Sequence, residues 1–173
     1  MDDIKPMIGL EDGYRINETF SDDFEGSELN GEKWYPFCPE WEGRKLGRFV
    51  PENVCVKDGT LQLTARIQDE IPLKCKAAGY SNLTTACVRG GTHPPKENFH
   101  FKDGFHTATF LREKEHLRRY LDGRLTFDHP NDYYHNPMDL NIDCEPLFAW
   151  CGEVDKADLP AVYTLEYVRV WQK

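Results

Sequence analysis

Residues 53–65 read Asn-Val-Cys-Val-Lys-Asp-Gly-Thr-Leu-Gln-Leu-Thr-Ala, two β-prone runs on either side of an Asp-Gly dipeptide. Asp-Gly accepts the positive φ angles of a two-residue turn and is the strongest short-range signal for a β-hairpin. In the second run Leu61, Leu63 and Ala65 alternate with polar residues, so one face of the strand is apolar and the other is wet. The stretch predicts an antiparallel sheet that is covered on one side.

Two further stretches extend this pattern. The run from Val162 to Trp171 is rich in β-branched and aromatic residues and predicts one long inner strand. The stretch Phe110–Leu121 has two interpretations, because its helix formers could also build an amphipathic helix. We favour a hairpin with strands over 105–110 and 117–121, ending at Asp122-Gly123. Together with turn residues at roughly every 8–12 positions, these strands predict an all-β sandwich.

Length and charge narrow the classes of function. The 173 residues fit a single domain over residues 1–173, with an irregular N-terminal segment over 1–15. The net charge of −9 argues against nucleic acid as a partner, since phosphates require clustered Lys and Arg. The basic residues between Arg112 and Arg119 alternate with Glu113 and Glu115, which is typical of an ordinary solvated surface.

No apolar run approaches the roughly 20 residues that cross a bilayer, so we expect no membrane partner. The first residues lack a basic and apolar leader. The sequence as written therefore predicts a cytoplasmic protein, or an extracellular one if a signal was removed. The six cysteines are expected to be reduced, with disulfides as the alternative in an oxidising compartment.

Motifs near both ends of the chain follow one another in an order that β-patterning alone does not explain. They are Phe20–Gly26, Lys33-Trp34, Thr84–Arg89, Phe105–Thr107, Tyr120–Leu125, Pro137–Asn141 and Glu166–Trp171. In this order they resemble glycoside hydrolase family 16. The resemblance implies a concanavalin A-like jelly-roll β-sandwich of two antiparallel sheets. It also implies a poly- or oligosaccharide partner, held in a cleft on the concave face.

The family's catalytic strand has no counterpart at the expected place. Family members carry Glu-x-Asp-x-x-Glu, because a retaining glycosidase needs two carboxyl groups about 5–5.5 Å apart. In this chain only residues 89–104 occupy the corresponding interval, with Glu97 and Asp103 but no carboxylate triad. We therefore expect a jelly roll that is shortened in the middle.

A similar sequence motif occurs later in the chain, at Glu153, Asp155 and Asp158. These acids are the candidate catalytic residues, although the family has a variable loop at this place. The alternative interpretation is a solvated acidic loop, because a short motif needs its structural context.

The resemblance also suggests residues that contact sugar. Trp41 and Arg44 match a loop beside the cleft, where an indole can stack on a sugar ring and a guanidinium can bind hydroxyls or a sulfate. Asn141, Glu145 and Trp150 follow the family's concave strand. Packing of the two tryptophans against the sandwich is the alternative role.

No cofactor is required by this chemistry, and a structural calcium is the one metal considered. Gly59 and Glu166 match positions that hold calcium in some family members, through a backbone carbonyl and an Asp. Glu replaces that Asp here, which shifts the ligand geometry, so we favour a metal-free turn.

Three hypotheses of function follow. The first is a degenerate carbohydrate-active domain with weak or no hydrolysis and with glycan binding. The second is an active hydrolase of β-glucan or algal galactan whose internal catalytic segment is absent from the sequence, and the third is a structural or assembly module. A sandwich that lacks central strands leaves strand edges unpaired, so we also expect self-association through these edges.

Overall fold

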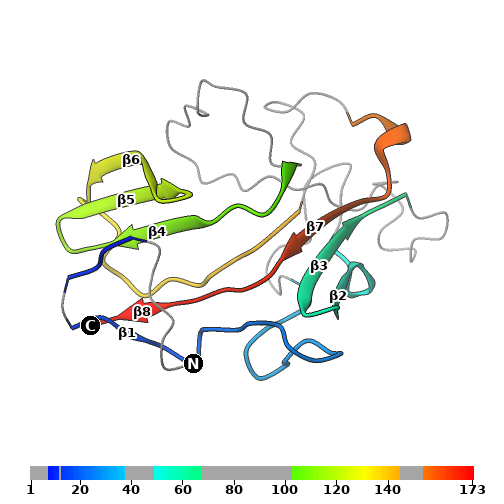
Figure 1. The fold of residues 1–173 in the computed structure, drawn as a ribbon, viewed down its shortest axis with the longest axis horizontal. Helices are drawn as coiled ribbons and strands as arrows, with labels where there is room; N and C mark the ends of the chain where they lie inside the picture. Colours follow the sequence, from blue (N-terminus) through cyan, green and yellow to red (C-terminus); the bar gives the residue numbers. More distant parts are fainter. Residues whose placement is uncertain (1–7, 12, 38–48, 68–102, 145–153) are drawn as a thin grey trace. The chain divides into compact units, whose positions relative to one another are not determined.

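The computed structural model describes residues 8–11, 13–37, 49–67, 103–144 and 154–173 (Figure 1). Within these ranges the regular elements are β-strands and two short 3-10 helices. They are β1 (Arg15–Ile16), η1 (Pro51–Asn53), β2 (Val54–Lys57), β3 (Thr60–Ala65), β4 (Ala108–Arg112), β5 (His116–Leu121), β6 (Arg124–Pro130), η4 (Lys156–Asp158), β7 (Ala161–Leu165) and β8 (Trp171–Gln172). All strand pairs are antiparallel, which confirms the all-β class.

The chain divides into two compact units. One unit contains residues 1–12 and 87–140, and the other contains 13–86 and 141–173. The single domain over residues 1–173 stays a prediction. In the described part of residues 1–15, β1 begins only at Arg15. No helix among the described residues is long and apolar enough to cross a membrane.

The second unit contains the hairpin that the Asp-Gly dipeptide predicts. β2 pairs with β3 from Val54–Leu63 to Lys57–Thr60, and Asp58 and Gly59 form the turn with φ angles of 53° and 70°. Positive φ at both positions gives the turn the twist of the flanking strands. The predicted hairpin is confirmed.

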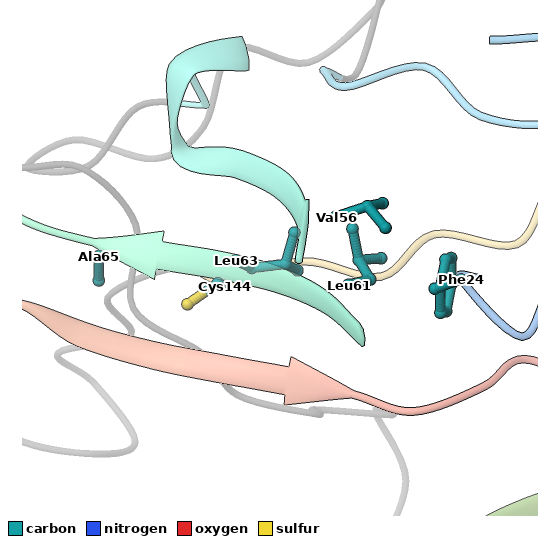
Figure 2. Packing of buried hydrophobic residues seen from close by; sticks show 6 residues of the cluster. All are labelled: Phe24, Val56, Leu61, Leu63, Ala65 and Cys144. Atoms are coloured by element: carbon teal, nitrogen blue, oxygen red, sulfur yellow. The ribbon is translucent and has the colours of Figure 1, made fainter. Parts of the chain in front are cut away.

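The apolar face of β3 builds the core of this unit (Figure 2). Leu61, Leu63 and Ala65 are 4%, 8% and 0% exposed, as their alternation predicts. Phe24, Val56 and Cys144 complete the buried cluster, which draws together three segments far apart in the sequence. Burial of this kind is worth about 1.5–3 kcal/mol for each large side chain, so the cluster anchors the unit.

The C-terminal run is not one long strand, and this prediction was wrong. β7 pairs with β3 only from Ala161 to Leu165, because β3 starts at Thr60, directly after the turn. Beyond Leu165, none of the residues that the structure describes pairs with the chain in that sheet. It next forms a bridge between Val168 and Asp22, and Trp171–Gln172 then pairs with β1. The run therefore belongs to two sheets.

The N-terminal motif Phe20–Gly26 is hydrogen-bonded to the second half of the C-terminal run. The Asp22 carboxylate accepts hydrogen bonds from the Phe24 N–H and from Trp34 Nε1, both at 2.9 Å. Its backbone exchanges two hydrogen bonds of 2.8 Å with Val168. One residue thus connects the N-terminal motif to the C-terminal one.

The first unit contains the sheet of β4, β5 and β6, in that order. It confirms a hairpin rather than a helix over Phe110–Leu121. The first strand starts at Ala108 and not at Phe105. Just before it, the Thr107 N–H donates to the Asp122 carboxylate at 2.8 Å instead of to a strand carbonyl. A bulge between Arg119 and Tyr120 then shifts the register with β6.

Candidate functional site

The predicted sugar-contacting residues lie mostly outside the described part of the chain. Trp41, Arg44, Glu145 and Trp150 fall in segments 38–48 and 145–153, which the structure does not describe. Asn141 is described and is exposed. It directly precedes Ile142, which packs against the core cluster of this unit, and lies three positions before Cys144, which belongs to that cluster. The five positions therefore stay predictions as sugar contacts.

The predicted catalytic acids do not lie on a strand where they are described. Glu153 lies outside the described residues. Asp155 precedes η4 and its carboxylate accepts a hydrogen bond from the Ala157 N–H at 2.9 Å, which caps the short helix. Asp158 ends the same helix and is exposed. Two of the three acids thus occupy a 3-10 turn at the surface, and their catalytic role stays a prediction.

The predicted calcium positions lie at one end of the β3–β7 pair. Leu61 is opposite Leu165 in this antiparallel pair, so Gly59, which precedes β3, and Glu166, which follows β7, lie beyond the same end of the two strands. Both residues are exposed. The described residues contain no group of three or more His, Cys, Asp or Glu side chains that could hold a metal ion. A calcium at this turn would depend on backbone carbonyls for its remaining ligands.

Charged side chains with defined partners concentrate on the β4–β5–β6 sheet. Arg118 donates to Glu113 at 2.8 Å and to Asp128 at 3.3 Å, and His116 Nδ1 lies 2.9 Å from Asp128. The hydrogen bond from His116 lowers the pKa of Asp128, and the hydrogen bond and charge of Arg118 lower it further. This carboxylate therefore stays ionised and suits ion pairing rather than proton donation.

Asp122, in the turn after β5, is a second carboxylate with defined partners and a lowered pKa. His106 Nδ1 lies 2.8 Å from the Asp122 carboxylate, which also accepts the Thr107 N–H. The hydrogen bond from His106 and then that from the Thr107 backbone lower the pKa of Asp122. Asp122 therefore fixes the start of β4 as a charged acceptor. The sequence shows the Asp-Gly turn but gives no sign of this partner.

Comparison with solved structures identifies the class of fold. The chain superposes on a non-specific endo-β-1,3(4)-glucanase of glycoside hydrolase family 16 with a TM-score of 0.63, at 18% identity, covering 95% of this chain and 93% of the other. A β-porphyranase of the human gut bacterium Bacteroides plebeius gives 0.67 at 14% identity, with 95% and 94% covered. The chain thus has the jelly-roll fold of glycoside hydrolase family 16, and the predicted resemblance is confirmed.

Sequence comparison points to one kind of relative. The chain is 40% identical over 63 residues to β-porphyranase B of Phocaeicola plebeius, and 43% identical over 54 residues to β-porphyranase E of Zobellia galactanivorans. These stretches cover 35% and 31% of this chain, but only 20% and 19% of the relatives. No family model matches the chain.

Proposed function

We propose that this chain is a carbohydrate-active domain that binds a galactan poly- or oligosaccharide and hydrolyses it weakly or not at all. The sequence similarity to β-porphyranases, on a jelly-roll fold, carries the proposal. A structure that shares this fold, the κ-carrageenase of Pseudoalteromonas carrageenovora, is a complex with an oligosaccharide of κ-carrageenan. Galactan binding is therefore compatible with the fold.

We expect little hydrolysis because the chain lacks a pair of carboxylates in the arrangement that hydrolysis requires. The sequence between Val88 and Phe105 has no Glu-x-Asp-x-x-Glu, which leaves no room for the two carboxylates that retaining hydrolysis requires. Of the later acids, Asp155 is engaged in capping η4. A carboxylate that is held by a backbone N–H at the surface is a poor candidate for a nucleophile.

The test combines binding with turnover. Affinity electrophoresis in gels that contain agarose or porphyran should retard the protein, while reducing-sugar release from agarose, porphyran, carrageenan, laminarin and lichenan should stay at background. Hydrolysis that is lost in Glu153→Gln and kept in Glu32→Gln, at an exposed position outside the predicted site, would instead establish the loop acids as catalytic. Migration that neither glycan affects would refute the binding proposal.

An active hydrolase is the second candidate. It is favoured by the relatives themselves, which are named as enzymes and match this chain over at most a fifth of their length. In this case an internal segment with the catalytic strand is absent from the 173-residue sequence. The intact mass of the protein purified from its source decides between the two candidates, since a segment of this kind would add several kilodaltons.

We also propose that the chain associates with itself through a strand edge. In the described part of the chain, β4 pairs with β5 alone and ends its sheet. Phe105 and Phe110, close to this edge, are 60% and 51% exposed. Unpaired backbone groups beside exposed aromatic rings favour pairing with another chain.

A further inference from the structure

The two outer strands of the β4–β5–β6 sheet differ in the features that prevent pairing with another strand. β6 contains the bulge, which leaves Thr126 without an opposite residue in β5, and it ends at Pro130, which has no N–H to donate. β4 pairs with β5 without a bulge, and its five residues include no proline and no lysine. Natural sheets protect their edges with bulges, prolines and lysines, so among the described strands β4 is the less protected edge of this sheet.

Backbone hydrogen bonds at both ends of β4 fix its orientation toward β5. The Glu113 N–H donates to the His116 carbonyl at 2.9 Å, and the Asp122 N–H donates to the Thr107 carbonyl at 2.9 Å. In an antiparallel pair, opposed residues alternate between pairs that exchange backbone hydrogen bonds and pairs that do not. The register of β4 with β5 has no shift, so this alternation continues through all of β4.

Every second residue of β4 therefore directs its backbone groups away from β5. Thr109 and Leu111 continue the bonded series and face β5 with their N–H and C=O groups. The outward-facing residues, all of them exposed, are Ala108, Phe110 and Arg112. In the described part of the chain β4 pairs with β5 alone, so these outward N–H and C=O groups are available to a further strand.

We propose that these groups pair with β4 of a second copy of this chain, in an antiparallel arrangement about a two-fold axis at Phe110. Phe110 then lies opposite Phe110 of the second copy, and Ala108 lies opposite Arg112 in both halves of the interface. An interface of this kind uses the same surface on both copies and closes at the dimer. The inference rests on the proposed association through a strand edge and specifies both the partner and the register.

The register follows from the spacing of the outward groups and from charge. An axis at Phe110 lets all three outward residues exchange N–H···O bonds with the second strand, whereas any other axis places at least one of them opposite a residue beyond β4. Side chains of opposed residues project to the same side, so the two Phe110 rings meet and each Arg112 meets a small, uncharged Ala108. An axis at Arg112 would instead oppose two guanidinium groups, which is unfavourable.

Residue-resolved amide hydrogen exchange tests the pairing on the full 173-residue chain, in reducing buffer because Cys55 is exposed and free. At a concentration where light scattering shows about nine-tenths of the chains as dimers, the amides of the three outward residues should exchange about tenfold more slowly than in the monomer, because only the monomer exposes them. The Asp128 amide is the internal control. It faces away from β5 on the other edge, because Arg118 opposite it bonds to β4, and its exchange should not depend on concentration.

A charge substitution tests the register. Ala108→Glu places a carboxylate opposite Arg112 of the second copy, in both halves of the dimer, and should lower the dimer Kd about threefold or more. A charge with no partner in the edge strand would instead weaken association. Ala108→Glu combined with Arg112→Gln should lose the gain, and Ser27→Glu, which adds the same charge at an exposed position, should not show it. Unfolding curves establish that each variant is folded.

The possible failures are distinguishable. A dimer in which the three amides exchange as fast as in the monomer, or in which Ala108→Glu weakens association, would overturn the proposed pairing and leave the association itself in place. A chain that stays monomeric at every concentration would overturn the proposed association and the pairing together. Galactan binding is measured separately by affinity electrophoresis, so neither result decides it.

Discussion

Asp22 is one residue whose side chain and backbone serve different partners. Its carboxylate binds the Phe24 N–H and Trp34 Nε1, while its backbone pairs with Val168. The side chain therefore shapes the loop that follows, and the backbone attaches that loop to the C-terminal run. Phe24 is 2% exposed and belongs to the buried cluster, so a change in the conformation of this loop alters the packing of the core.

We expect Asp22→Asn to lower the free energy of unfolding by about 1–2 kcal/mol, because a charged acceptor is lost from two hydrogen bonds. Trp34→Phe removes only the indole donor and should cost about 1 kcal/mol. Urea unfolding of both variants and of the double variant measures the coupling free energy between the two side chains. The double variant should lose less than the sum of the two, since they share one interaction. Full additivity, or an equal effect of Glu25→Gln at an exposed neighbouring position, would contradict this role.

Acid stability should depend on Asp122. Its pKa is lowered in the folded protein, chiefly by the hydrogen bond with His106. A carboxylate with a depressed folded pKa contributes stability above its unfolded pKa of about 3.9 and loses it as the pH falls through the folded pKa. Melting temperatures measured from pH 5 to pH 2 should therefore fall less steeply in Asp122→Asn than in the unmodified protein. Asp139→Asn, at an exposed loop position, is the control, and an identical slope in all three proteins would disprove the assignment.

At the scale of elements, the Asp58-Gly59 turn carries the register of β2 and β3. An added Cβ at Gly59 meets no atom within 4 Å, so a substitution there tests backbone conformation alone. Gly59→Ala should cost about 1–2 kcal/mol, because a φ of 70° is unfavourable for a residue with a side chain. Gly31 also has open space around it but no left-handed φ, so Gly31→Ala should not destabilise. Chemical denaturation of the two variants makes the comparison, and equal midpoints would be the contrary result.

The same hairpin illustrates what the sequence can predict. Its turn residues and its alternation lie within thirteen consecutive positions, so local preferences and the final structure agree. The run from Val162 to Trp171 has equally clear β preferences, yet it divides between two sheets. Its break is set by the point where β3 turns at Thr60, about a hundred residues earlier. Pairing at this distance leaves no trace in local sequence.

For the candidate site, too, the residue types could be predicted from local sequence and their spatial arrangement could not. The aromatic and basic residues that we predicted as sugar contacts are visible in the sequence, and the order of motifs indicated a jelly roll. Which charges share a face was not visible, because Arg112 and Arg119 stand seven positions apart and would lie on opposite sides of one continuous strand. The turn between β4 and β5 brings them to the same side.

At the scale of the whole molecule, net charge opposes self-association and exposed strand edges favour it. A net charge of −9 keeps chains apart, but repulsion between exposed charges is screened beyond about 8 Å at physiological salt. The edge of β4, which has no second partner strand among the described residues, and the exposed rings of Phe105 and Phe110 act at shorter range. Association should therefore increase with salt.

We expect the 173-residue chain to form dimers or larger species at micromolar concentration. Ala108→Lys places a charge in the edge strand, where natural sheets use lysine to prevent edge pairing, and should shift the mass toward the monomer. Ser27→Lys, at an exposed position of the other unit, adds the same charge and should leave the mass distribution unchanged. Static light scattering at low and high salt measures both effects. A strictly monomeric protein with cooperative unfolding at all salt concentrations would contradict the prediction, because it would require β4 to be covered within its own chain.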